Sequence, residues 1–126
     1  MAPVLIVDDD AATRDSLAEA LELAGFSVEV ASRGEEALRA AVRHPPLAAV
    51  VDFRMPGMSG VEVIRRLRAL PGLEDLCAIL ATAWPEPPDG LDPPALLIEK
   101  PFSMERLLVL LERCGVVAAP SAATMT

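Results

Sequence analysis

The chain has 126 residues, a length typical of one domain, and a formal net charge of −8. This charge argues against direct binding to nucleic acid, because such a binder needs a cationic surface to displace counterions from phosphates. Hydrophobic residues make up 52% of the chain, which excludes intrinsic disorder of the chain as a whole. No apolar run is long enough to cross a bilayer, so we expect a cytoplasmic protein without a membrane partner.

Short apolar runs alternate with amphipathic stretches along the chain. In chain order we expect a strand at 3–8, a helix at 11–24, a strand at 27–31, a helix at 32–44, a strand at 47–52, a helix at 59–70, strands at 77–82 and 95–99, and a helix at 103–115. Alternation of this kind predicts a parallel sheet with helices on both faces.

Polar residues mark the expected helix starts. Ser32 with Glu35, and Ser59 with Glu62, have the spacing of capping boxes. Ser103 is placed to cap the last helix. Glycines follow the first and last helices and predict left-handed ends there.

Polar and charged residues follow four of the five expected strands. They are Asp8, Asp9, Asp10, Asp52, Thr82 and Lys100. In a doubly wound sheet the carboxyl ends of the strands meet where the ligand binds, so we expect these side chains to converge. Carboxylates gathered this closely repel one another unless a cation joins them, and Mg²⁺ fits two or three carboxylates. The alternative for residues 8–10 is a solvated helix start, where acidic residues favour the helix dipole.

Such a cluster suits phosphoryl transfer. Asp52 is expected to attack phosphorus as a nucleophilic carboxylate and to form an acyl phosphate. Lys100 would neutralise charge on the phosphoryl oxygens, and the Thr82 hydroxyl would donate to one of them.

The segment 52–60, DFRMPGMSG, resembles the corresponding segment of receiver domains of two-component signalling, as do LIVDDD at 5–10, ATA at 81–83 and KPF at 100–102. The resemblance covers the chain from Pro3 to about Gly115. It implies a flavodoxin-like, doubly wound, five-stranded parallel sheet of order 2-1-3-4-5, with a receiver domain at 1–115. Residues 116–126 are small, and polar at the end, so we expect a flexible tail there.

The resemblance also implies roles for individual residues. Asp52 corresponds to the phosphoacceptor, Thr82 to the switch hydroxyl and Lys100 to the phosphate-contacting lysine. The implied Mg²⁺ ligands are Asp8, Asp9, Asp52 and the backbone carbonyl of Arg54, and a cis bond is implied before Pro101. Asp10 has no metal role and is expected to cap the first helix.

As a receiver, the chain would take its phosphoryl group from a sensor histidine kinase or a histidine phosphotransfer protein. That donor would dock near the first helix and the loop after the fifth strand, and a further, unidentified protein would read the phosphorylated state. The chain would not be a turnover enzyme, since it would catalyse only its own phosphorylation and dephosphorylation. Trp84 and Arg54 border the pocket in receivers and are expected to hinder hydrolysis of the acyl phosphate; an exposed tryptophan is the alternative.

Two features depart from the receiver pattern. Leu97 stands where receivers usually carry an aromatic residue that couples to the threonine. Residues 83–94 contain five prolines in twelve residues, which oppose a helix, so we predict that the usual fourth helix is missing or reduced. The last helix, apolar also at Val109 and Leu110, would then expose a patch for a partner or for self-association, unless the proline segment folds over it.

Two other functions compete with the receiver interpretation. A haloacid-dehalogenase-type phosphatase would use Asp8 and Asp10, but Ala12 stands where its motif needs threonine or valine. A receiver-shaped interaction module would not use phosphate at all, and Leu97 favours it.

The chain has two cysteines, Cys77 and Cys114, without the spacing of a metal site. We expect two buried thiols in a reducing cytoplasm, and a redox role is the alternative.

Overall fold

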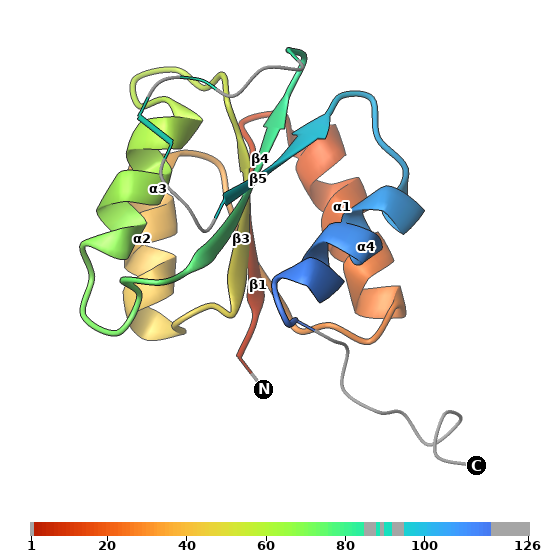
Figure 1. The fold of residues 1–126 in the computed structure, drawn as a ribbon, viewed down its shortest axis with the longest axis horizontal. Coiled ribbons are helices and arrows are strands. Elements are labelled where there is room, and N and C mark those ends of the chain that lie inside the picture. Colours follow the sequence, from red (N-terminus) through yellow and green to blue (C-terminus); the bar gives the residue numbers. More distant parts are fainter. Residues whose placement is uncertain (1, 85–87, 89, 92–94, 117–126) are drawn as a thin grey trace.

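The computed structural model describes residues 2–84, 88, 90–91 and 95–116. Its elements are β1 (Val4–Val7), α1 (Ala11–Leu23), β2 (Val28–Ala31), α2 (Gly34–Arg43), β3 (Ala48–Asp52), α3 (Gly60–Arg68), β4 (Cys77–Thr82), β5 (Ala95–Glu99) and α4 (Met104–Arg113) (Figure 1). The strands form one parallel sheet of order β2-β1-β3-β4-β5, which confirms the predicted flavodoxin-like topology. Within the described part of the chain, every helix is too short or too polar to cross a membrane.

The helices cover both faces of the sheet. Figure 1 shows the sheet nearly edge-on, with α2 and α3 on one side and α1 and α4 on the other. Alternate strand residues face opposite sides, so β1 contributes Leu5 and Val7 to the α2–α3 core and Val4 and Ile6 to the α1–α4 core. Because both faces are covered, β1 is apolar throughout.

The register of the central strands brings their carboxyl ends level. Val7 pairs with Val51, so the residues that follow them, Asp8 and Asp52, leave neighbouring strands side by side. On the far side of β3, Asp52 pairs with Ala81, next to Thr82. The order reverses between β1 and β3, which places these residues at the switch point of the sheet.

Three of the predicted helix caps are present. Ser59 Oγ accepts a hydrogen bond from the Glu62 backbone N–H at 3.3 Å, and Ser103 Oγ accepts one from the Arg106 N–H at 3.1 Å. Asp10 caps α1 by accepting from the backbone N–H and the hydroxyl of Thr13. These two bonds, the hydroxyl first, lower the pKa of Asp10 and keep the capping carboxylate ionised.

The predicted capping box at Ser32 is wrong. Helix α2 begins at Gly34, and its N-cap residue, Arg33, makes no side-chain capping bond. Ser32 instead donates from its hydroxyl to Glu36 Oε2 at 3.0 Å. A Cβ on Gly34 would lie 2.6 Å from Met58 Sδ, so the first residue of this helix packs closely against the loop after β3.

The segment between β4 and β5 differs from the usual receiver pattern, as predicted. None of its described residues, which are 83, 84, 88, 90 and 91, lies in a helix. The helix that receivers usually have between their fourth and fifth strands is therefore missing or reduced. The remaining residues of this segment, including most of its prolines, lie outside the described residues.

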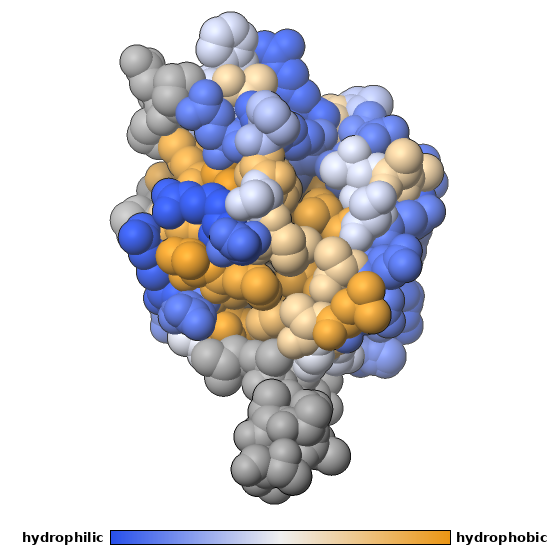
Figure 2. Space-filling view, turned by 90° about the vertical axis from the view of Figure 1, so that its right-hand side faces the viewer, coloured by the Kyte–Doolittle hydropathy of each residue, from blue (hydrophilic) through white to orange (hydrophobic). Residues whose placement is uncertain are grey.

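The predicted apolar patch on α4 is confirmed at one position and wrong at another. Val109 is 42% exposed, whereas Leu110 is 1% exposed and belongs to the α1–α4 core. Figure 2 shows apolar side chains gathered on the side of the molecule that carries α1 and α4, bordered by hydrophilic residues. Whether the proline segment covers this patch depends on residues outside the described ones.

Val116 is the first residue of the predicted tail. It is buried, and its backbone N–H donates to the Leu111 carbonyl at 2.9 Å. Residues 117–126 lie outside the described residues, so the prediction of a flexible tail is untested there.

The prediction of two buried thiols is also wrong. The structure joins Cys77 and Cys114 in a disulfide, and both residues are only partly buried. Their Cα atoms are 5.7 Å apart, within the usual range for a disulfide.

Candidate functional site

The sequence-predicted acidic residues converge at the carboxyl edge of the sheet. Asp8 and Asp9 follow β1, and Asp52 is the last residue of β3. One carboxylate oxygen from each of the three lies within 4.8 Å of the others. Asp10, by contrast, does not join this cluster, because its side chain caps α1.

Lys100 completes the cluster from the other side of β3. Its Nζ lies 2.8 Å from Asp52 Oδ1 and 3.9 Å from Asp8 Oδ2. The backbone N–H of Lys100 donates to the Thr82 carbonyl at 2.8 Å, which fixes the position of the residue just beyond β5. The bond before Pro101 is cis, as predicted. Lys100 is the only lysine of the chain.

Burial raises the pKa of Asp8 above its ordinary value. The Asp10 backbone N–H, which donates to Asp8 Oδ1 at 2.9 Å, lowers this pKa in part. To a smaller extent, the negative charge of Asp52 raises the pKa of Asp8, the positive charge of Lys100 lowers it, and the negative charge of Asp9 raises it. Three crowded carboxylates, one of them desolvated, therefore face a single ammonium group. This all-oxygen, anionic donor set fits a hard divalent cation.

The loop after β3 is held against the strand by the glycine at the start of α3. The Gly60 N–H donates to the Phe53 carbonyl at 2.9 Å. A Cβ on Gly60 would lie 2.4 Å from the Asp52 carbonyl oxygen and 2.8 Å from Leu80 Cδ1. Only glycine permits this approach, which explains the small residue that follows Ser59 in the segment 52–60.

Thr82, Trp84 and Arg54 lie together beside the cluster. Thr82 is buried at the end of β4, and its Oγ1 accepts a hydrogen bond from the Trp84 N–H at 3.1 Å. The Arg54 guanidinium lies 6.0 Å from the centroid of the Trp84 ring, within cation–π range. Trp84 is 56% exposed. The sequence indicated Arg54 and Trp84 as residues that border the pocket, but it did not predict the contact between their side chains.

Arg14 is a site residue that sequence reasoning missed. Its Nη1 donates to the Asp8 carbonyl at 3.0 Å, and so braces the backbone that carries the acidic pair. An arginine in the second turn of an amphipathic helix gives no sequence signal of such a contact, because the partner is six residues away on a strand end.

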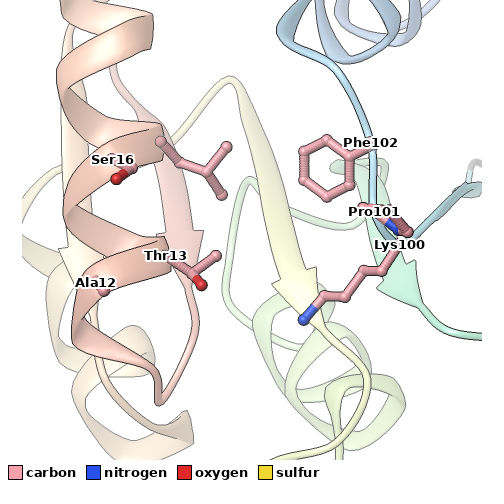
Figure 3. A pocket seen from close by; sticks show the side chains of 7 residues that line it. Ala12, Thr13, Ser16, Lys100, Pro101 and Phe102 are labelled. Atoms are coloured by element: carbon pink, nitrogen blue, oxygen red, sulfur yellow. The ribbon is translucent and has the colours of Figure 1, made fainter.

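A groove opens beside the cluster between α1 and the segment after β5. Its volume is about 560 Å³, and its lining residues are Ala12, Thr13, Ser16, Leu17, Lys100, Pro101 and Phe102. Figure 3 shows the α1 residues on one side of it and Lys100, Pro101 and Phe102 on the other. This is the surface at which the sequence predicts docking of a phosphodonor.

A family model supplies the deciding comparison. The model described as the response regulator receiver domain matches residues 4–112. The chain belongs to this family. Receivers are the signal-accepting domains of two-component response regulators, and the family match covers every residue of the cluster described above.

The relatives of this receiver include regulatory proteins that are longer than this chain. It is 38% identical to the response regulator MprA of Mycobacterium sp. (strain KMS), over 98% of this chain and 56% of that protein. It is likewise 38% identical to the transcriptional regulatory protein PrrA of Mycobacterium tuberculosis, over 98% of this chain and 55% of that protein. The chain thus spans little more than half the length of these relatives.

Solved receiver structures share the fold. The chemotaxis response regulator CheY4 of Vibrio cholerae superposes with a TM-score of 0.83 at 30% identity, covering 90% of this chain and 98% of that one. The response regulator TrrA of Thermotoga maritima, solved in complex with Mg(2+)-BeF, gives 0.77 at 29% identity, covering 90% and 99%.

Proposed function

We propose that this receiver accepts a phosphoryl group on Asp52, with Mg²⁺ held by Asp8, Asp9, Asp52 and the backbone carbonyl of Arg54. The observation that carries the proposal is the cluster of three carboxylates whose oxygens lie within 4.8 Å, with Lys100 Nζ 2.8 Å from Asp52. The TrrA receiver was solved with Mg(2+)-BeF, which supports the choice of cation.

In the proposed reaction a carboxylate oxygen of Asp52 forms a bond to phosphorus while the bond from phosphorus to the donor atom breaks. The donor atom keeps the electron pair. Mg²⁺, when bound, neutralises negative charge on the phosphoryl oxygens. Lys100 moves from its pairing with Asp52 to a phosphoryl oxygen, and the Thr82 hydroxyl donates to another. Catalysis is then mostly positioning and charge stabilisation.

The proposed donor is a sensor histidine kinase or a histidine phosphotransfer protein, and the groove between α1 and residues 100–102 is the proposed docking surface. Phe102 offers an apolar contact in this groove, and Lys100, which also lines it, has its ammonium group 2.8 Å from Asp52 Oδ1. We place the protein in the cytoplasm, where it signals to an unidentified downstream protein and turns over no separate substrate.

The two competing functions fare differently. The phosphatase interpretation uses Asp8 and Asp10 together, but the Asp10 side chain caps α1 by accepting from the Thr13 N–H and does not join the acidic cluster. The phosphate-independent interaction module draws support from Leu97, which packs against the α2–α3 core as an aliphatic residue. The intact acidic cluster favours phosphorylation over this module.

The function is tested with the unmodified chain, Mg²⁺ and acetyl phosphate. We expect the mass of one phosphoryl group to be added, to be labile in alkali, and to map to the peptide that contains Asp52. Trp84 fluorescence should change with Mg²⁺ and change further with beryllofluoride, because Trp84 adjoins Thr82. A protein that neither binds Mg²⁺ nor gains the adduct would contradict the proposal, and the interaction module would replace it.

Removal of the Lys100 charge should slow phosphorylation. Lys100→Met keeps the length of the side chain but removes the ammonium 2.8 Å from Asp52, so the rate of adduct formation from acetyl phosphate should fall about a hundredfold. Arg106→Met, at an exposed position on α4, is the matched control and should leave the rate unchanged. Mass spectrometry over time measures both, with circular dichroism in Mg²⁺ to verify folding. An unchanged rate in Lys100→Met would show that the ammonium does not assist transfer.

The Arg54–Trp84 contact should lengthen the lifetime of the phosphorylated state. The backbone N–H of Trp84 donates to Thr82 Oγ1, and the Arg54 guanidinium lies 6.0 Å from the centroid of the Trp84 ring, so we expect these two side chains to restrict the approach of water to the phosphoryl group. Trp84→Ala and Arg54→Ala should therefore each lose the phosphoryl group several-fold faster, whereas Arg54→Lys, which keeps the charge, should lie between them and the unmodified chain. The measurement is decay of the intact phosphorylated mass after removal of acetyl phosphate. Equal lifetimes in all variants would mean that Trp84 is simply an exposed tryptophan.

A further inference from the structure

The Cys77–Cys114 disulfide links two elements at the edge of the sheet opposite to the phosphorylation site. Cys77 is the first residue of β4, whose last residue is Thr82, so the disulfide and the cluster lie at opposite ends of this strand. Cys114 is the C-cap residue of α4. The bond closes a loop with a sequence separation of 37, and this loop contains Thr82, Lys100 and the whole of α4.

The backbone holds the two cysteines close to each other independently of the bond. Cys77 is fixed by strand pairing opposite Ala48 of β3. The Cys114 N–H donates to the carbonyls of Leu110 and Leu111 at 3.1 and 3.0 Å. Gly115, with a φ of +78°, then ends the helix in a left-handed conformation. Two thiols at these positions would therefore stay neighbours after reduction, which favours closure of the bond within one molecule.

Both cysteines are accessible to small reagents. Each is intermediate between buried and exposed, unlike the core residues Ala78 of β4 and Leu111 of α4, which are fully buried. A thiolate at this surface can reach a small disulfide in solution, whereas a thiol sealed in the core could not.

We propose that Cys77 and Cys114 are a redox modification site that takes oxidising equivalents from a low-molecular-weight disulfide such as oxidised glutathione. One cysteine thiolate attacks the reagent, forms a mixed disulfide and releases one small thiol. The second cysteine thiolate attacks the protein sulfur of the mixed disulfide, forms the Cys77–Cys114 bond and releases the second small thiol. The two protein thiols are oxidised, two protons are released, and the reagent is reduced to two small thiolates that take up those protons.

Oxidation fastens the end of α4 to the start of β4. In the reduced state α4 is held on the sheet by its buried face, Leu107, Leu110 and Leu111. In the oxidised state the covalent loop also removes conformational freedom from the unfolded chain, so the folded domain gains stability. The modification thus acts on the helix that carries the exposed Val109, without touching the carboxylates at the other edge of the sheet.

The test uses the full chain in buffers of reduced and oxidised glutathione at fixed pH. In the oxidising buffer we expect alkylation followed by intact-mass measurement to find no free thiol, in a monomer that carries no glutathione. The melting temperature should rise by about 10 °C over the reduced protein, and amide exchange in the last turn of α4 should slow at least about tenfold. Cys77→Ser, Cys114→Ser and the double variant should show neither change between the two buffers.

These readouts require no phosphoryl group, so an Asp52→Asn background should respond in the same way, and failure of the proposed function would leave this result intact. The comparison of buffers on the unmodified chain does not depend on the folding of any variant. Two free thiols in the oxidising buffer would overturn the proposal, as would a stable glutathione adduct or a disulfide between two molecules in place of the internal bond.

Discussion

Asp52→Asn is expected to accept no phosphoryl group from acetyl phosphate and Mg²⁺ while it keeps the native fold. The amide is nearly the same size as the carboxylate but is not a nucleophile towards phosphorus, so the labile adduct should be lost completely. Mg²⁺ should also bind at least about tenfold more weakly, because one of three clustered anionic ligands is removed. Intact-mass analysis measures the first effect, and titration of Trp84 fluorescence with Mg²⁺ measures the second.

Asp75→Asn is the matched control for this prediction. Asp75 is exposed and lies just before β4, at the amino edge of the sheet and away from the cluster. The same chemical change at this position should alter neither phosphorylation nor Mg²⁺ binding. If Asp52→Asn still gained an alkali-labile phosphoryl group, another carboxylate would be the acceptor, and Asp8 and Asp9 would be the next positions to replace.

Gly60→Ala should destabilise the domain by about 3 kcal/mol. The added Cβ would lie 2.4 Å from the Asp52 carbonyl oxygen and 2.8 Å from Leu80 Cδ1, so either β3 or α3 must move. This cost exceeds the gain of a few tenths to 1 kcal/mol that alanine normally gives over glycine in a helix. Because the strained atom belongs to Asp52, phosphorylation should slow as well. Urea unfolding gives the free energy, and acetyl phosphate labelling gives the rate.

Gly57→Ala is the appropriate comparison, because it separates backbone strain from steric overlap. Gly57 has a φ of +84°, but a Cβ there would meet nothing within 4 Å. The free energy of unfolding should therefore fall by only about 1 kcal/mol, the cost of placing an alanine in the left-handed conformation. If the two variants were equally stable, the close approach of α3 to β3 would have no energetic weight, and the glycine at position 60 would need another explanation.

The strands and most of the site follow from local patterns in the sequence. The runs at 77–82 and 95–99 match β4 and β5 in full, because each is a short and mostly apolar run that ends in a polar or charged residue. The cluster was predictable for a topological reason. Parallel strands direct their carboxyl ends to one edge, so residues that are far apart in sequence, such as Asp8, Asp52 and Lys100, are brought together once the sheet order is known.

The errors concern features that depend on contacts between distant segments. Ser32 has the spacing of a cap, but its hydroxyl donates to Glu36, and the helix begins at Gly34, which packs against Met58. Cys77 and Cys114 are separated by 37 residues, and only the register of β4 and the end of α4 bring them together. Leu110 was expected at the surface, since helical periodicity alone does not fix how wide a buried face is.

The hydrogen bond between the Trp84 N–H and Thr82 Oγ1 ties a buried hydroxyl to the main chain two residues later. Because that bond occupies one lone pair of the oxygen, the hydroxyl hydrogen is left to point elsewhere. A displacement of Thr82 towards an occupant of the cluster would pull on the peptide unit of residue 84. A change at the cluster would then be transmitted to the exposed residue Trp84 through the backbone. This coupling would not require an aromatic side chain at position 97, where the chain has a leucine.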